Sequence, residues 1–125
     1  MRCISNFILP LFLLLISSCS GSRQFAEQTN MAVDAYQGGD YAKAFVTAEQ
    51  IITKTGEKNK PAEGHVYAIA GKSAYLLEDY DQSLVYINAA REQGYSDEQT
   101  MVFQADNYHR IDNLSKEITL LEEYS

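Results

Sequence analysis

Apolar and small residues recur at intervals of three and four positions from residue 25 to residue 124. This spacing places them on one face of an α-helix, whereas a half-buried strand would alternate apolar and polar residues, and no such alternation is found here. Pro61 is the only proline in the stretch, so few positions are closed to a helix. The pattern predicts an all-α chain made of successive helices.

Short polar turns divide these helices into pairs. Three turns separate the two helices of a pair: Gly38-Gly39-Asp40, Glu78-Asp79 and Asp112-Asn113. Asp40, Asp79 and Asn113 are candidate N-caps, because a short polar side chain can accept a hydrogen bond from a free N–H of the first helical turn. Between the last two pairs, Ser96-Asp97-Glu98-Gln99 has the form of a capping box and predicts a helix start.

The turns recur at a regular distance. Asp79 follows Asp40 by 39 residues, and Asn113 follows Asp79 by 34 residues. The five additional residues of the first interval fall in a polar stretch, 54–61, that reads as a loop. A period of 34 residues is that of tetratricopeptide (TPR) repeats.

The residues inside each period resemble the TPR pattern of small and bulky packing positions. The second period matches closely, with Tyr67, Gly71, Ala74, Asp79-Tyr80, Ser83, Ile87 and Ala90. The first has Ala32, Ala35, Gly39-Asp40-Tyr41, Ala44, Ala48 and Ile51, but Gln28 in place of the bulky residue. The third has Met101, Ala105, Tyr108, Asn113-Leu114, Leu121 and Tyr124, but Glu117 where a small residue is usual.

The resemblance implies a short TPR-like α-solenoid of about three helical hairpins over residues 25–125. The repeats are expected at about 25–58, 64–97 and 98–125. Stacked hairpins bury apolar faces that one hairpin could not bury alone. No further helix is predicted after the third hairpin, so Ile118, Leu120 and Leu121 are expected to leave an apolar flank exposed.

The first residues of the chain have the features of an export signal. Arg2 is followed by an apolar run of ten residues, 7–16, which is shorter than the roughly 20 residues that a spanning helix needs. Ile16-Ser17-Ser18-Cys19 resembles the lipobox of bacterial lipoproteins. The resemblance implies a cleaved signal peptide at 1–18, lipid on Cys19, and a tether at 19–24. An ordinary secretory signal cut nearby is the alternative interpretation.

Lipidation would attach the mature chain to a membrane. Because Ser20 and not Asp follows Cys19, the resemblance to Gram-negative lipoproteins implies the outer membrane, facing the periplasm. Two or three acyl chains hold a protein firmly, since each buried CH₂ contributes about 0.8 kcal/mol. Cys3 lies inside the signal, so Cys19 is the only cysteine of the mature chain and an internal disulfide is excluded.

The charge of the mature chain argues against a nucleic-acid partner. Removing Arg2 from the 10 Lys and Arg residues leaves 9, against 17 Asp and Glu, which is a net charge of −8. Nucleic-acid binding needs a basic face. No nucleic-acid partner is therefore expected, and membrane attachment is expected through the lipid rather than through surface charge.

The sequence has no recognisable catalytic motif. It contains two histidines, His65 and His109. It has no phosphate loop, no nucleophile elbow and no zinc-ligand spacing. No cofactor and no metal are predicted, and the protein is not expected to be an enzyme. The alternative is an envelope enzyme or small-ligand binder that uses His65 and His109.

The first helix of each TPR hairpin lines a concave groove in that family, and the matching positions define a candidate binding surface. The proposed groove residues are Tyr36, His65, Lys72, Tyr75, His109 and Arg110. Tyrosines suit peptide contact, since an apolar ring carries a hydroxyl group. Lys72 and Arg110 are expected to meet acidic groups of the partner. An ordinary solvated face is the alternative interpretation of these positions.

These features together predict a membrane-anchored protein–protein interaction scaffold in a cell-envelope assembly. Its partner would be a protein or peptide of unknown identity. A narrower version of the hypothesis is a pilotin-like lipoprotein that escorts a subunit of an envelope machine, an analogy that rests on fold and location alone.

Overall fold

The structure is a computed structural model that describes residues 23–124, apart from the side chains at 116, 117, 120 and 124. The predicted signal peptide, Cys19 and most of the tether lie outside the described residues. Within them the chain forms a helix at 23–37, followed by α2 (Tyr41–Glu57), α3 (Gly64–Leu76), α4 (Tyr80–Glu92) and α5 (Glu98–Tyr124). The described residues contain no strand, so the all-α prediction is confirmed.

The first two predicted turns form as expected. The Asp40 carboxylate accepts a hydrogen bond from the Lys43 N–H at 3.2 Å. In the second turn the Asp79 carboxylate accepts from the Gln82 N–H at 3.3 Å. Each turn also contains a residue in the left-handed region, Gly39 with φ 84° and Glu78 with φ 66°, which ends the preceding helix.

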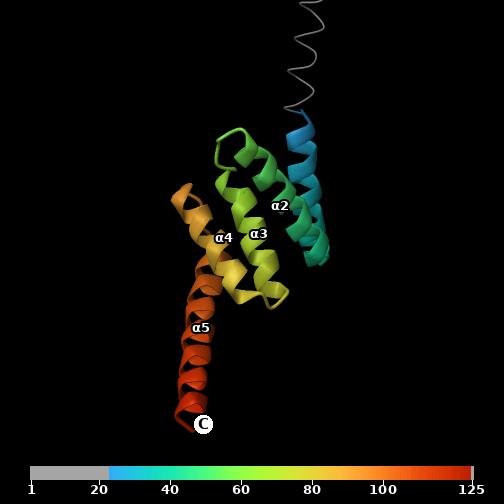
Figure 1. The fold of residues 1–125 in the computed structure, drawn as a ribbon. Helices are drawn as coiled ribbons and strands as arrows, with labels where there is room; N and C mark the ends of the chain where they lie inside the picture. Colours follow the sequence, from blue (N-terminus) through green and yellow to red (C-terminus); the bar gives the residue numbers. More distant parts are fainter. Residues whose placement is uncertain (1–22, 125) are drawn as a thin grey trace, which may run out of the picture.

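Neighbouring helices pack as antiparallel pairs through small residues. Figure 1 shows the 23–37 helix beside α2, with α3 between α2 and α4. The core between the first three helices contains the buried alanines Ala32, Ala44, Ala48 and Ala70, together with Ile51. Small side chains let the helix backbones approach closely, and they explain how a chain with few large buried residues forms a packed interior.

The predicted third hairpin is wrong, because α5 continues without a break from Glu98 to Tyr124. Asn113 lies exposed in the middle of this helix and caps nothing. The Asp112-Asn113 turn signal contains no glycine, and no residue there adopts a positive φ. An N-cap side chain stabilises a helix start only after the preceding helix has stopped, so the residue types alone did not produce a turn. The described chain therefore has two hairpins and one long helix.

The first half of α5 packs against α3 and α4 through polar side chains. Thr100, Gln104 and Asn107 are buried there. The Asn107 amide donates to the Ser83 hydroxyl at 2.9 Å, and the Gln104 amide donates to Asn88 at 2.6 Å. The second half of α5 extends away from the hairpins (Figure 1). No helix of the described chain is both long and apolar enough to span a membrane.

Candidate groove on the first helix of each hairpin

Three of the six predicted groove residues line one cavity. Tyr36 from the 23–37 helix and His65 and Lys72 from α3 border a half-open space of about 250 Å³. The remaining lining residues are Val33, Gln37, Ala68, Ile69 and Tyr95. On each helix these positions recur at spacings of three and four residues, so both helices present one face to the cavity.

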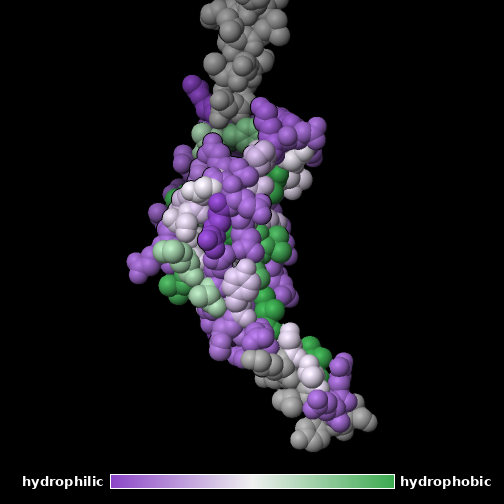
Figure 2. Space-filling view, turned by 90° about the vertical axis from the view of Figure 1, so that its left-hand side faces the viewer, coloured by the Kyte–Doolittle hydropathy of each residue, from purple (hydrophilic) through white to green (hydrophobic). Residues whose placement is uncertain are grey.

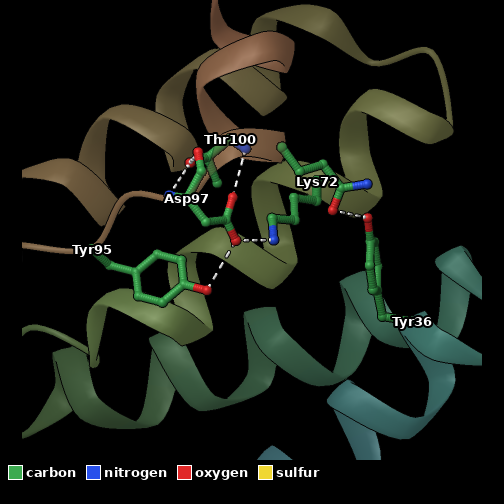
Figure 3. Close-up of polar contacts among 6 residues, drawn as sticks. Tyr36, Lys72, Tyr95, Asp97 and Thr100 are labelled. Carbon is green, nitrogen blue, oxygen red and sulfur yellow. Dashed lines mark hydrogen bonds and ion pairs between the residues drawn. The ribbon is translucent and has the colours of Figure 1, made fainter.

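Lys72 and Asp97 form an ion pair at the edge of this cavity, with the Lys72 Nζ 2.5 Å from a carboxylate oxygen (Figure 3). The Lys72 side chain is 12% exposed and the Asp97 side chain 33%. The same carboxylate accepts hydrogen bonds from the Tyr95 hydroxyl at 3.0 Å and the Thr100 N–H at 2.7 Å. Burial alone would raise the pKa of Asp97, but the bonds from Lys72 and Thr100 outweigh it and lower the pKa to about 2.

Asp97 is also the residue that caps α5. Its carboxylate accepts from the Thr100 N–H, while the Thr100 hydroxyl accepts from the Asp97 N–H at 2.9 Å. This is a reciprocal capping box that begins at Asp97, one residue after the predicted start at Ser96. One carboxylate therefore both starts α5 and attaches it to Lys72 of α3.

Tyr36 bridges the 23–37 helix to α5 across the face of α3. Its hydroxyl donates a hydrogen bond to the Gln99 side-chain oxygen at 2.8 Å (Figure 3). The Lys72 Nζ lies 5.9 Å from the centre of the Tyr36 ring, close enough for a cation–π contact. Burial is the main cause that raises the pKa of Tyr36, and the nearby Asp97 charge adds to it. The Tyr36–Gln99 bond therefore joins the 23–37 helix to the first turn of α5 beside the cavity.

Tyr75 and Arg110 belong to a separate cluster that attaches α5 to the second hairpin. The Tyr75 hydroxyl donates to Asp106 at 2.5 Å, and the Arg110 Nε donates to the same carboxylate at 2.6 Å. The Tyr75 ring stacks on Phe103 with centroids 3.8 Å apart, and the Arg110 guanidinium lies 4.6 Å from the centre of the Tyr80 ring. The hydrogen bond to Asp106 raises the pKa of Tyr75, and the bond from Arg110 lowers the pKa of Asp106.

Lys72 and Arg110, which were expected to offer positive charge to a partner, each meet an acidic residue of the chain itself. Lys72 is paired with Asp97 and Arg110 with Asp106, so both charges are neutralised within the protein. Asp106 and Arg110 lie four residues apart on α5, a spacing visible in the sequence, whereas nothing in the sequence relates Lys72 of α3 to Asp97 of the connection. The Lys72–Asp97 pair forms only when the start of α5 lies against α3.

The two histidines do not share a site. His65 Nδ1 lies 3.4 Å from a Glu63 oxygen. The His65 ring borders the cavity of about 250 Å³ and also a second cavity of about 560 Å³ that lies next to Phe25 and Pro61. His109 borders neither cavity and contacts Asn113, one turn further along α5, at 3.1 Å. Among the described residues no three His, Cys, Asp or Glu side chains are grouped so that they could hold a metal ion.

Tyr95 and Asp97 are the site residues that the groove prediction omitted. Both lie in the short connection between α4 and α5, not on a first helix of a hairpin. The capping-box pattern marked this connection as a helix start. The capping-box pattern did not indicate that Asp97 would contact Lys72, because that contact depends on how α5 packs.

No match was found for this chain among protein families, curated proteins or solved structures.

Proposed function

We propose that this protein is a membrane-anchored scaffold that binds a protein or peptide partner in the groove between the 23–37 helix and α3. In this proposal residues 25–125 form a TPR-like domain whose third unit is the single helix α5. The shared register of the first two hairpins supports it. Gly71 and Ala32 are buried at small-residue positions of the pattern, and Asp40 and Asp79 cap the second helix of each hairpin.

The observation that carries the proposal is the cavity beside Tyr36, His65 and Lys72. Its volume of about 250 Å³ is below the roughly 300–1,000 Å³ usual for small-molecule sites, and it is open on one side. A space of this size suits a single side chain of a larger partner. The separation of His65 from His109 gives no support to the alternative of a histidine-based enzyme or ligand site.

The chemistry of the cavity indicates which part of a partner would enter it. Val33, Ala68 and Ile69 provide apolar surface, while hydroxyl groups of Tyr36 and Tyr95 lie at the polar edge. Since Lys72 is already paired, no unpaired cation from this residue is available for an acidic ligand. We expect an apolar side chain to insert, with the hydroxyl groups contacting the partner backbone.

Filling the cavity should prevent binding without unfolding the chain. Val33 is half-buried at the cavity wall, and Val33→Phe would occupy the space that the partner side chain needs. A photo-crosslinker at the exposed Gln37 should trap one protein in cells, and Val33→Phe should reduce that product about tenfold or more, the loss expected for a central contact.

The matched control is Val46→Phe on the outer side of α2, where Val46 is 52% exposed. This variant adds the same ring outside the groove and should leave the crosslink unchanged. Equal crosslinking in the Val33→Phe variant, with helicity retained, would remove the groove from the proposal.

The anchor is the second part of the proposal. It is supported by Ile16-Ser17-Ser18-Cys19 in the sequence. Cys19→Ala should abolish incorporation of a palmitate analogue and leave the protein uncleaved or soluble in the periplasm, because no thiol remains at the lipobox position. The measurement is metabolic labelling of cells followed by membrane fractionation. Labelling as strong in Cys19→Ala as in the natural sequence would exclude the anchor.

A pilotin-like role in an outer-membrane assembly is the narrower form of this proposal. It rests on the expected location together with the small helical domain. The protein trapped from Gln37 would decide it, since a pilotin-like scaffold should yield a subunit of an envelope machine.

A further inference from the structure

One face of α5 carries a seven-residue repeat along most of its length. The positions alternate by four and three residues: Thr100, Gln104, Asn107, Ile111, Leu114, Ile118 and Leu121. A spacing that averages 3.5 residues keeps one seam of a helix facing a neighbouring helix, as in a coiled coil. We call this row the α5 seam.

The two ends of the α5 seam differ in both composition and environment. Thr100, Gln104 and Asn107 are polar and buried against α3 and α4. Beyond them Leu114 is 56% exposed, Ile118 49% and Leu121 71%. The seam is therefore polar where the chain covers it and apolar where no helix of the described chain covers it. In Figure 2 hydrophobic surface interrupts the hydrophilic surface of the projecting part.

The exposed end continues an existing helix–helix interface. Ile111, one turn after the buried Asn107, is half-buried and marks the point where α3 and α4 no longer cover the seam. A row of isoleucine and leucine directed at solvent is unfavourable, since burying each apolar side chain would release it from water. Burial of the α5 seam beyond Ile111 would therefore require a further helix packed against it.

We propose that the apolar end of the α5 seam pairs with the same segment of a second copy of this chain, as a parallel two-stranded coiled coil. The order of residues supports a parallel pair. Ile111 and Ile118 occupy the first core position of each heptad, and Leu114 and Leu121 the second. β-Branched residues at the first position with leucine at the second favour two parallel strands.

The direction of α5 in the molecule fits parallel pairing. The start of the 23–37 helix and the C-terminal end of α5 lie at opposite ends of the molecule (Figure 1). Parallel helices would therefore place the starts of both 23–37 helices at the same end of the dimer. This step rests on the proposed anchor: two copies held by Cys19 in one membrane would share that orientation, whereas an antiparallel pair would direct the anchors to opposite ends.

Two heptads form a short seam, and the proposed anchor would compensate for that length. A coiled coil in solution usually needs three or four heptads. Confining both copies to one membrane raises the concentration of each segment near the other, which converts a weak contact into a stable one. The second copy is favoured over a lipid surface as occupant because the apolar row is a narrow seam at core spacing.

Cysteine crosslinking of the full chain in cell membranes tests the pairing. In a parallel pair each Leu114 faces Leu114 of the other copy, so Leu114→Cys should form a disulfide-linked dimer under mild oxidation. Thr119→Cys places the same group on an exposed position of α5 outside the seam and is the matched control. The unaltered chain measures any background from Cys3 and Cys19. We expect about tenfold more dimer for Leu114→Cys than for Thr119→Cys, because only the seam holds the two thiols within reach of each other.

Several outcomes would overturn the proposal. One is equal dimer from the two cysteine variants. Another is a dimer that forms only when Leu114→Cys and Ile118→Cys copies are mixed, which would indicate antiparallel pairing. Linkage of Leu114→Cys to a different protein would assign the seam to a partner helix, and protection of this cysteine without any linkage would assign it to a lipid surface. Palmitate labelling and the Gln37 crosslink report separately on the anchor and the groove.

Discussion

Gly71→Leu is expected to lower the free energy of unfolding by about 1–3 kcal/mol or more, because α3 and α4 nearly touch at this glycine. A Cβ atom at residue 71 would lie 2.7 Å from the Ile87 Cγ1, 3.0 Å from the Ile87 N and 3.2 Å from the Ser83 O. The last two atoms belong to the α4 backbone and cannot rotate away. The helices would have to separate, which would loosen the contact around Ile87, a side chain with 0% exposure.

Thermal unfolding followed by circular dichroism measures this effect. For a domain of this size 1 kcal/mol corresponds to roughly 4–8 °C in Tm, so a fall of about 5–20 °C is expected. Gly56→Leu is the matched control, because no atom lies within 4 Å of a Cβ at that position in the last turn of α2. Its Tm should equal or exceed that of the natural sequence, since leucine has a higher helix propensity than glycine. A Gly71→Leu protein with an unchanged Tm would refute the close α3–α4 contact.

The second large effect is expected from the Lys72–Asp97 pair. Lys72→Met keeps an apolar chain of similar length and removes the ammonium group, which leaves the partly buried Asp97 without its cation. The free energy of unfolding at pH 7 should fall by about 1–3 kcal/mol, less than for a fully buried pair because the Asp97 side chain is 33% exposed. Lys54→Met on the exposed side of α2 is the control, with an expected change within about 0.5 kcal/mol.

The pH dependence of stability provides an independent measurement of the same pair. The pKa of Asp97 is about 2 in the folded protein, below its ordinary value of 3.8. Its contribution is therefore complete above about pH 4 and is lost as the pH falls through about 2, because protonation then favours the unfolded chain. Denaturant unfolding between about pH 4 and pH 2 should show a steep loss of stability, and Lys72→Met and Asp97→Asn should both flatten it. An equally steep loss in both variants would show that another carboxylate dominates.

Loss of the pair should also affect the groove. Lys72 lines the cavity and Asp97 caps the start of α5, so the α3 side of the cavity and the position of α5 depend on one contact. The Tyr36–Gln99 hydrogen bond joins the 23–37 helix to the first turn of α5 and should weaken when α5 shifts. Tyr75 and Arg110 hold α5 at a second point through Asp106. Substitutions at these two residues would therefore alter the packing of α5 as well as any binding surface.

The helices and the first two hairpins could be predicted from the sequence because their causes are local. Apolar spacing places side chains on one helix face, and Asp40 and Asp79 cap the helices that they precede. Gly71 marked a close helix approach in the same way, since only a residue without a side chain fits there. Tyr36, His65 and Lys72 were expected on one surface because their positions share the hairpin register, and they do line one cavity.

The tertiary structure alone decided the form of α5 and the pairing of Lys72 with Asp97. Asp112-Asn113 has the residue types of a helix cap, but a cap needs a chain that has already left the helix, and no residue there takes a positive φ. The ion pair of Lys72 with Asp97 and the hydrogen bond of Tyr75 to Asp106 join residues 25 and 31 positions apart, which no helical spacing relates. Arg110 and Asp106, by contrast, lie four residues apart on α5, so that pair is local. Which polar groups meet depends on the angle and position at which α5 packs against α3 and α4. That packing divides the six predicted groove residues: three line a cavity, Tyr75 and Arg110 contact Asp106, and His109 contacts Asn113 outside the cavity.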